Sequence, residues 1–106
     1  MKNYSYSKFF LNFANKTKLG IILSLKEKSM SVNELSKEIG GEQSNVSHHL
    51  KNLLGCSIVS SRKKGKKKIY SLNASTVKPM LKLVEIHAKK NCCDNCDEAC
   101  RRCLDG

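Results

Sequence analysis

The sequence predicts a mainly α-helical domain with one small β-hairpin. Three observations indicate this fold class: apolar residues recur at helical spacing in five segments, a Gly-Gly pair separates two short amphipathic segments, and a glycine-centred basic turn joins two runs with strand character. The chain has 106 residues and a single proline, and this length suits one domain with one modest core.

Aromatic and aliphatic side chains mark the first two expected helices. The first carries an aromatic stripe at helical spacing, made of Tyr6, Phe9, Phe10 and Phe13. We expect this stripe to pack in a core or a dimer seam rather than to stack on nucleic-acid bases. The second helix follows directly, and its apolar residues are Leu19, Ile22 and Leu23 on one face with Ile21 and Leu25 beside them.

Two short helices joined by a glycine turn come next. Ser31 and Glu34 have the spacing of a capping box, in which each side chain accepts a hydrogen bond from the other residue's backbone N–H. This box opens a short helix that ends at Gly40-Gly41, and a further helix places apolar residues at positions 46, 50, 53 and 54. Two short helices separated by a glycine-containing turn are typical of a helix-turn-helix.

A hairpin and a last helix complete the expected domain. Ile58-Val59 opens one strand, residues 67–72 form the other, and Gly65 lies at the tip between them. The last helix begins near residues 75–76 and tolerates Pro79 in its first turn. Its apolar arc is wider than one small domain needs to cover, so we expect this helix to mediate a dimer.

Charge divides the chain into two parts. The net charge is +11, with +13 in residues 1–90 and −2 in residues 91–106, which also hold five of the six cysteines. We therefore expect a basic globular domain over 1–90 and an acidic, Cys-rich tail over 91–106. With no apolar run long enough to span a membrane and no signal-peptide pattern, the protein is expected to be cytoplasmic, with reduced thiols and no membrane partner.

Polar and basic residues point to double-stranded DNA as the partner. The exposed face of the fourth helix carries short hydrogen-bonding side chains and a lysine: Gln43, Ser44, Asn45, Ser47, His48 and Lys51. Six basic residues surround the hairpin glycine: Arg62, Lys63, Lys64, Lys66, Lys67 and Lys68. Each feature alone also fits a solvated helix face or a targeting signal. Together they predict a winged helix-turn-helix whose helix enters the major groove and whose wing lies beside the backbone.

Three segments carry a likeness to a known family: residues 14–19 before the second helix, residues 43–51 with a Val-Ser-His-His-Leu-Lys core, and the wing end at 69–72. They resemble the ArsR/SmtB family of winged-helix repressors over most of the chain. The resemblance implies a homodimer, paired through the first and last helices, that represses its own operon and leaves DNA when a metal binds. It implies that the operator-facing residues are Gln43, Ser44, Asn45, Ser47 and His48. One departure is Glu42, where the family usually has a serine or a similar N-cap.

The resemblance also offers several positions for a metal site, and most are incomplete in this chain. Ser31 and Asn33 replace the Cys pair of the arsenic-type site that enters the third helix. The zinc-type site on the last helix has only its first half, Glu85 and His87. The cadmium- and lead-type site retains one of two recognition-helix cysteines, Cys56, which we expect to be buried as a small hydrophobe.

Five cysteines within twelve residues make the tail the expected inducer site. They are Cys92, Cys93, Cys96, Cys100 and Cys103. Thiolates select thiophilic ions: three suit As(III) or Sb(III), and four suit Zn²⁺, Cd²⁺ or an iron–sulfur cluster. The tail resembles the As(III) site of vicinal cysteines that some family members have at the end of the last helix. As(III) is therefore the favoured inducer, with Cd, Pb and Zn as alternatives.

Other interpretations of the tail stay open. The cysteines could line a helix seam, or they could sense oxidants, because the neighbouring Lys89, Lys90, Arg101 and Arg102 favour the reactive thiolate. A constitutive DNA-binding protein with a permanent structural zinc is a further alternative. An enzyme is not expected, since the sequence has no Ser/His/Asp arrangement, phosphate loop or carboxylate pair.

Overall fold

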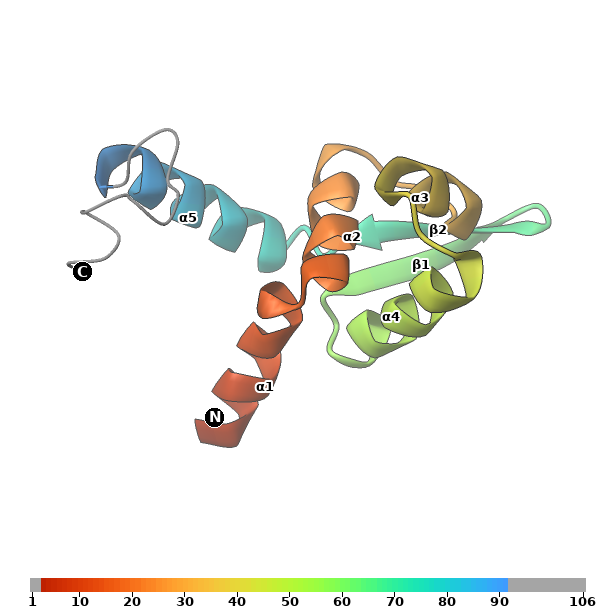
Figure 1. The fold of residues 1–106 in the computed structure, drawn as a ribbon. Coiled ribbons are helices and arrows are strands. Elements are labelled where there is room, and N and C mark those ends of the chain that lie inside the picture. Colours follow the sequence, from red (N-terminus) through yellow and green to blue (C-terminus); the bar gives the residue numbers. More distant parts are fainter. Residues whose placement is uncertain (1–2, 92–106) are drawn as a thin grey trace. The chain divides into compact units, whose positions relative to one another are not determined.

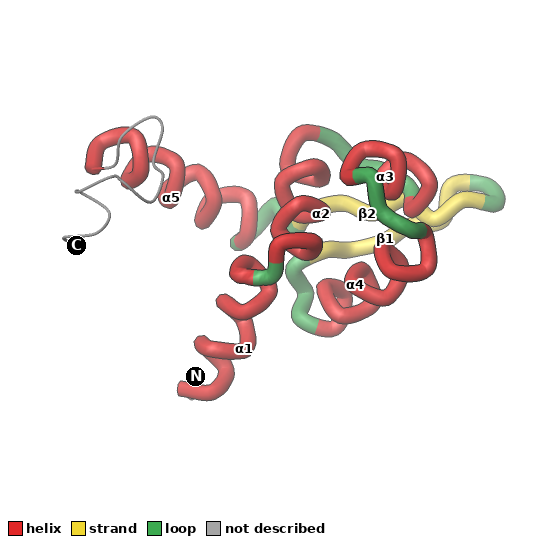
Figure 2. Tube along the Cα trace, viewed as in Figure 1, coloured by secondary structure: helices red, strands yellow, loops and turns green. Residues whose placement is uncertain are grey.

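A computed structural model of the chain describes the backbone of residues 3–91 and the side chains of residues 6–91. Its elements are α1 (Asn3–Ala14), α2 (Lys16–Glu27), α3 (Val32–Ile39), α4 (Gln43–Gly55), β1 (Val59–Lys64), β2 (Lys67–Leu72) and α5 (Val77–Asn91), as Figures 1 and 2 show. Helices and hairpin follow in the predicted order, which confirms the mainly α-helical fold class. The chain divides after Asn73 into two compact units.

Helices α2, α3 and α4 pack on one another and on the hairpin, and this packing forms the core of the first unit. Its fully buried side chains come from the three helices and from the residue just before β1: Ile21, Ile22, Leu25, Leu35, Val46, Leu50, Leu53 and Ile58. A bridge between Met30 and Tyr70 adds a short extended segment beside β2, with backbone hydrogen bonds of 3.1 and 2.8 Å in the two directions. The core therefore holds α4 and the hairpin in a fixed mutual arrangement.

The inward face of α2 differs from the predicted one. Ile21, Ile22 and Leu25 are buried, whereas Leu23 is 46% exposed. Successive helical residues are about 100° apart, so Leu23 lies that much further round the helix than Ile22 and outside the buried arc. The sequence offers five aliphatic residues in this helix, and only the packing against α3, α4 and β2 selects which of them are buried.

Side-chain caps set where the first helices of the core begin. Asn15 caps α2 by accepting a hydrogen bond from the backbone N–H of Lys18 at 2.9 Å. The predicted capping box of α3 is confirmed, with Ser31 and Glu34 each accepting from the other's backbone N–H. These hydrogen bonds from Ser31 lower the pKa of the exposed Glu34 carboxyl. Gly40 ends α3 in the left-handed region, with φ of +72°.

The second unit contains α5, which begins at Val77, one or two residues later than predicted. Val77 and Leu81 are its buried residues. Leu83, Val84 and Ile86 are large apolar side chains that remain exposed. The apolar arc of this helix is thus only partly covered within one chain.

Candidate nucleic-acid interface

Helix α4 presents the predicted polar face to solvent. Its expected DNA-contact residues are all exposed: Gln43, Ser44, Asn45, Ser47, His48 and Lys51. On the opposite side of the helix, Val46, Leu50 and Leu53 are completely buried. A rigidly held helix with short amides, hydroxyls and imidazoles on its outer face suits the reading of base edges in a major groove.

The first turn of α4 is tied to α3. Glu42 occupies the N-cap position but makes no side-chain capping hydrogen bond, as expected for a residue that caps poorly. Instead, the amide of Gln43 donates a hydrogen bond to Oδ1 of Asn33 in α3. No local pattern indicates that Asn33 belongs to this surface, because the contact joins residues ten apart across the turn.

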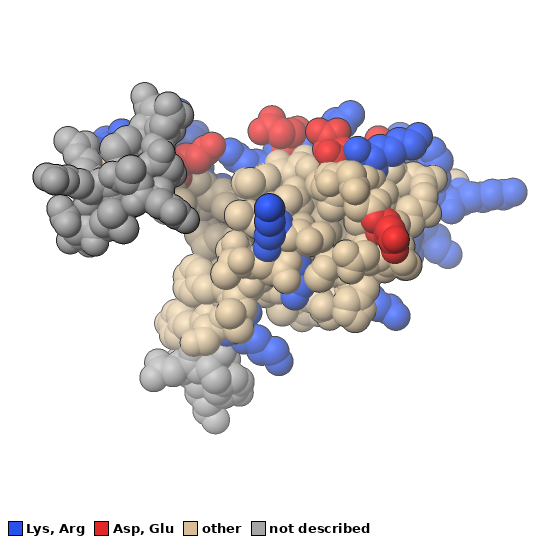
Figure 3. Space-filling view, viewed as in Figure 1, with Lys and Arg blue, Asp and Glu red and all other residues tan. Residues whose placement is uncertain are grey.

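The lysines of the hairpin lie opposite one another, so their charges repel across the strand pair. Lys63 lies directly opposite Lys68 in the antiparallel register, and Lys64 lies opposite Lys67. All six basic residues of the hairpin are exposed, and the lysines project from the tip beyond the helices in Figure 3. Like charges directly opposite each other destabilise a strand pair, so the arrangement favours a bound polyanion that neutralises them.

The structure brings the start of α4 and the wing to one hollow. This hollow of about 180 Å³ is lined by Ser31, Val32, Asn33, Gln43, Lys67 and Lys68. Its side chains supply amide and ammonium donors, while the Ser31 hydroxyl donates to Glu34 within the capping box, and none of the six lining residues is acidic. The first turn of α3, the first turn of α4 and β2 thus form one continuous donor surface, which sequence reasoning had assigned only in part.

The two adjacent histidines of α4 lie in different surroundings. His48 is exposed, while His49 is half-buried, with its Nδ1 atom buried and without a hydrogen-bond partner. Burial, followed by the charges of Lys18 and His48, lowers the pKa of His49. His48 is therefore the imidazole of this pair that remains accessible, and it belongs to the set expected to face DNA. Within residues 6–91, no group of three His, Cys, Asp or Glu side chains could hold a metal ion.

Cysteines of the tail are the predicted ligands of the inducer. All five tail cysteines fall outside the described residues. Cys56 is half-buried rather than buried, and its Sγ accepts a hydrogen bond from Nδ2 of Asn12 at 3.6 Å. In the part of the chain that the structure describes, no helix is long and apolar enough to cross a membrane.

A helix-turn-helix followed by a basic antiparallel hairpin defines a winged helix-turn-helix protein. The family model for bacterial regulatory proteins of the arsR family matches residues 15–61. The chain belongs to this ArsR family, as its resemblance in sequence predicted. Its relatives are transcriptional regulators, which agrees with the expectation that it is not an enzyme.

Two relatives illustrate the match in sequence. Transcriptional activator HlyU of Vibrio cholerae is 35% identical over 71 residues, which are 67% of this chain and 66% of HlyU. The HTH-type transcriptional regulator KmtR of Mycobacterium tuberculosis is 32% identical over 72 residues, which are 68% of this chain and 55% of KmtR. The matched part therefore spans just under two thirds of HlyU and little more than half of KmtR.

Solved structures agree with this assignment. HlyU from V. cholerae matches with a TM-score of 0.71 at 29% identity, covering 82% of this chain and 97% of HlyU. The cadmium metal-sensor CMTR from M. tuberculosis matches with a TM-score of 0.63 at 27% identity, covering 74% of this chain and 81% of CMTR. The winged-helix fold predicted from the sequence is confirmed.

Proposed function

We propose that this chain is a homodimeric repressor that binds double-stranded operator DNA through α4 and the hairpin. The polar face of α4 reads base edges, and the lysines of the hairpin neutralise backbone phosphates. The observation that carries the proposal is the register of the hairpin, which holds Lys63 against Lys68 and Lys64 against Lys67. A polyanion compensates for that repulsion, and α4 lies beside the hairpin with its polar residues outward.

Dimerisation through α1 and α5 is part of the proposal. Each helix leaves large apolar side chains in solvent: Tyr6, Phe10 and Leu11 in α1, and Leu83, Val84 and Ile86 in α5. Exposed apolar surface of this kind marks an interface. In such a dimer the two recognition helices enter successive major grooves about 34 Å apart.

A thiophilic ion is the proposed inducer, and As(III) is the favoured one. The donors are the tail thiolates Cys92, Cys93, Cys96, Cys100 and Cys103. The family's other donor positions do not fit a soft ion here: Ser31 is engaged in the capping box, and the His87 ring contacts Asn91 at 3.3 Å. The tail gathers five thiols, and thiolates are soft donors, so the choice of a thiophilic ion follows from their chemistry.

Metal binding at the tail is proposed to lower the affinity for DNA. A bound ion holds several thiolates together next to α5, the helix proposed to pair the two subunits. A coupling free energy of about 1–3 kcal/mol between the two sites reduces operator affinity by about 5- to 150-fold. The matching cadmium sensor CMTR supports a metal ligand, while the name of HlyU records activation. Repression is therefore the direction that the experiment has to establish.

Fluorescence anisotropy tests the proposal on the reduced, full-length protein. The labelled DNA is a duplex from upstream of its own gene, and arsenite, Zn²⁺, Cd²⁺, Pb²⁺ and peroxide are titrated separately. We expect release at about one arsenite per subunit, since three thiolates complete the coordination of one As(III). Release by peroxide alone would make the tail a redox switch, and indifference to every addition would leave a constitutive DNA-binding protein.

Matched cysteine variants locate the inducer site. Cys92→Ser and Cys93→Ser are expected to abolish the response to arsenite and to leave DNA binding intact. Cys56→Ser is the control, because it removes a thiol at the C-cap of α4, outside the tail. If the metal-free tail variants lost DNA binding, the proposed separation of roles would be wrong.

A further inference from the structure

A second basic hollow lies at the other end of α4, away from the hairpin. It has a volume of about 430 Å³ and is formed by α1, α2 and the C-terminal turns of α4. Eight residues line it: Lys8, Leu11, Asn12, Lys18, Lys51, Asn52, Gly55 and Cys56. Leu11 and Lys51 lie at its border, where it adjoins the surface proposed for dimerisation and the polar face of α4, respectively. Three of them are lysines and none is acidic. Its size falls within the range of small-molecule sites.

A buried amide organises the floor of this hollow. Asn12 is only 4% exposed, and its Oδ1 accepts a hydrogen bond from Nζ of Lys18 at 3.2 Å. Its Nδ2 donates to the backbone oxygens of Lys8 and Phe9, both at 3.2 Å, and to Sγ of Cys56 at 3.6 Å. An ammonium group only donates, so the contact with Lys18 fixes which end of the amide carries the oxygen. The network thereby holds the ammonium group of Lys18 in one position.

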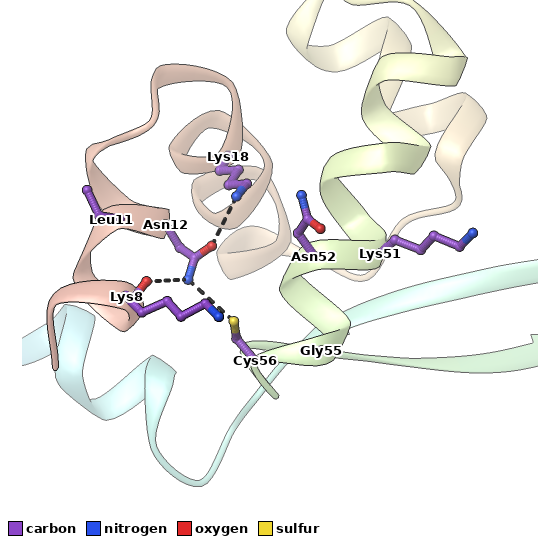
Figure 4. Close-up of a pocket in the computed structure, with 8 residues that line it drawn as sticks. All are labelled: Lys8, Leu11, Asn12, Lys18, Lys51, Asn52, Gly55 and Cys56. Atoms are coloured by element: carbon purple, nitrogen blue, oxygen red, sulfur yellow. Dashed lines mark hydrogen bonds between the residues drawn. The ribbon is translucent and has the colours of Figure 1, made fainter. Parts of the chain in front are cut away.

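The ammonium groups retain donors for a ligand. Lys18 uses one N–H on Asn12, and an ammonium carries three. Figure 4 shows Lys8 extending toward the Cys56 thiol, while Lys51 points outward at the rim. The C-terminus of α4 contributes only about half a negative charge, which is less than the two full positive charges of Lys8 and Lys18. The positive charge of Lys18 also contributes to the lowered pKa of the neighbouring His49.

The position of the hollow favours a small ligand over duplex DNA. The hollow begins at Lys51, eight residues after Gln43, so its nearer edge lies about 12 Å along α4 from the start of the helix. Figure 1 shows the tip of the hairpin at the end of this unit that carries the start of α4, opposite α1. The hollow also has one buried lining residue, Asn12, and two half-buried ones, Lys18 and Cys56, whereas all six basic residues of the hairpin are exposed.

We propose that this hollow is a binding site for a compact oxyanion, either a phosphate or a small dicarboxylate. The ammonium groups of Lys8 and Lys18 bind its oxygens from two sides, and the amide of Asn52 lies on the opposite wall as a further donor. Lys51 at the rim adds long-range attraction. The buried amide of Asn12 holds Lys18 in place, so the site exists before the ligand arrives.

Nuclear magnetic resonance on the isotope-labelled, full-length protein tests this site. Inorganic phosphate and succinate are titrated separately at constant ionic strength maintained with chloride. We expect saturable shifts of the Asn12 side-chain amide and of the Cys56 backbone amide. Stronger binding of phosphate identifies a phosphate site, and stronger binding of succinate identifies a carboxylate site. Shifts that stay linear and equal to those caused by chloride would overturn the proposal.

Lysine variants separate a site from general surface charge. Lys18→Gln and Lys8→Gln are each expected to raise the dissociation constant about tenfold, because each removes one full charge from a close contact. Lys8 is exposed, so Lys8→Gln tests the site even if Lys18→Gln disturbs the fold. Lys37→Gln, on the exposed part of α3, is the matched control and should leave binding unchanged. Equal binding by all three variants would overturn the proposal.

Two competing occupants give distinguishable results. The acidic tail of the same chain is tested by neutralising Asp94, Asp97 and Glu98 to their amides. If saturable anion binding appeared only in that variant, the tail would be the occupant and the small-anion proposal would fail. If duplex DNA of unrelated sequence shifted the Asn12 and Cys56 signals while phosphate and succinate did not, the hollow would be a DNA contact and the proposal would also fail.

Discussion

The two ends of α4 are both basic, and they differ in shape and in what supports the charge. At the first end, the polar residues of α4 and the lysines of the hairpin are exposed. At the second end, Lys18 is anchored by the buried amide of Asn12 beside the half-buried Cys56. Positive charge by itself attracts any anion. The surroundings decide which anion fits: an open, projecting surface suits a polyanion, and an anchored concave one suits a small oxyanion.

The largest effect that tests this comparison is expected in the hairpin. Changing Lys64, Lys66 and Lys67 together to glutamine should weaken binding to every DNA sequence by roughly 10²- to 10³-fold at about 0.1 M salt, and should reduce the slope of log K against log salt by about 3. Anisotropy titrations at several salt concentrations measure both quantities.

Lys18→Gln is the control from the other end of α4. We expect this substitution to change DNA affinity by less than about twofold, because Lys18 lies outside the donor surface formed by α3, α4 and β2. A loss of DNA affinity as large as that of the hairpin variant would show that the two ends act as one surface, and the comparison would break down.

The next effect concerns sequence specificity at the first end. Asn45→Ala is expected to weaken binding to the protein's own operator by about 1–3 kcal/mol, because an amide that contacts a base edge carries discrimination of that size. Binding to unrelated DNA should change little, and competition between the two DNAs measures the ratio. A uniform loss on both DNAs would assign Asn45 to the backbone instead.

Two variants test how the N-caps of α3 and α4 contribute to the free energy of unfolding. Ser31→Ala removes an observed capping hydrogen bond and is expected to lower the free energy of unfolding by about 1 kcal/mol. Glu42→Ser supplies a capping side chain where none bonds now, and should raise stability by up to about 1 kcal/mol. Urea denaturation measures both changes. Equal effects of the same sign would contradict the assignment of the two caps.

The smallest effect is a pH dependence at His49, in the middle of α4. Burial lowers the pKa of His49 below its ordinary value of 6.5, so the unfolded chain binds a proton before the folded one does. Stability is therefore complete above that value and falls as the pH drops below it, until the folded imidazole is also protonated. His49→Gln should flatten the fall. Urea midpoints measured above and below the ordinary value provide the check, with His48→Gln, an exposed neighbour, as the control.

Local patterns in the sequence predicted most of the fold. The capping box, the glycines that end α3 and form the hairpin tip, and the apolar positions of α4 each act over a few residues, and the structure has them as predicted. The interface was predicted as residue sets on α4 and on the hairpin. Asn33 and the hollow of about 180 Å³ join these two sets into one surface. This junction was not predictable, because it depends on how α3, α4 and β2 pack.

The sequence by itself determined the element order, the excess of positive charge, the polar face of α4 and the concentration of thiols in the tail. These are properties of composition and of short-range spacing. Only the tertiary structure decided that Leu23 is exposed and that Asn12 joins Lys18 to Cys56. The physical reason is that burial and the hydrogen bonds of a buried amide depend on contacts between residues far apart in the chain, 44 positions for Asn12 and Cys56, and such contacts exist only once the helices have packed.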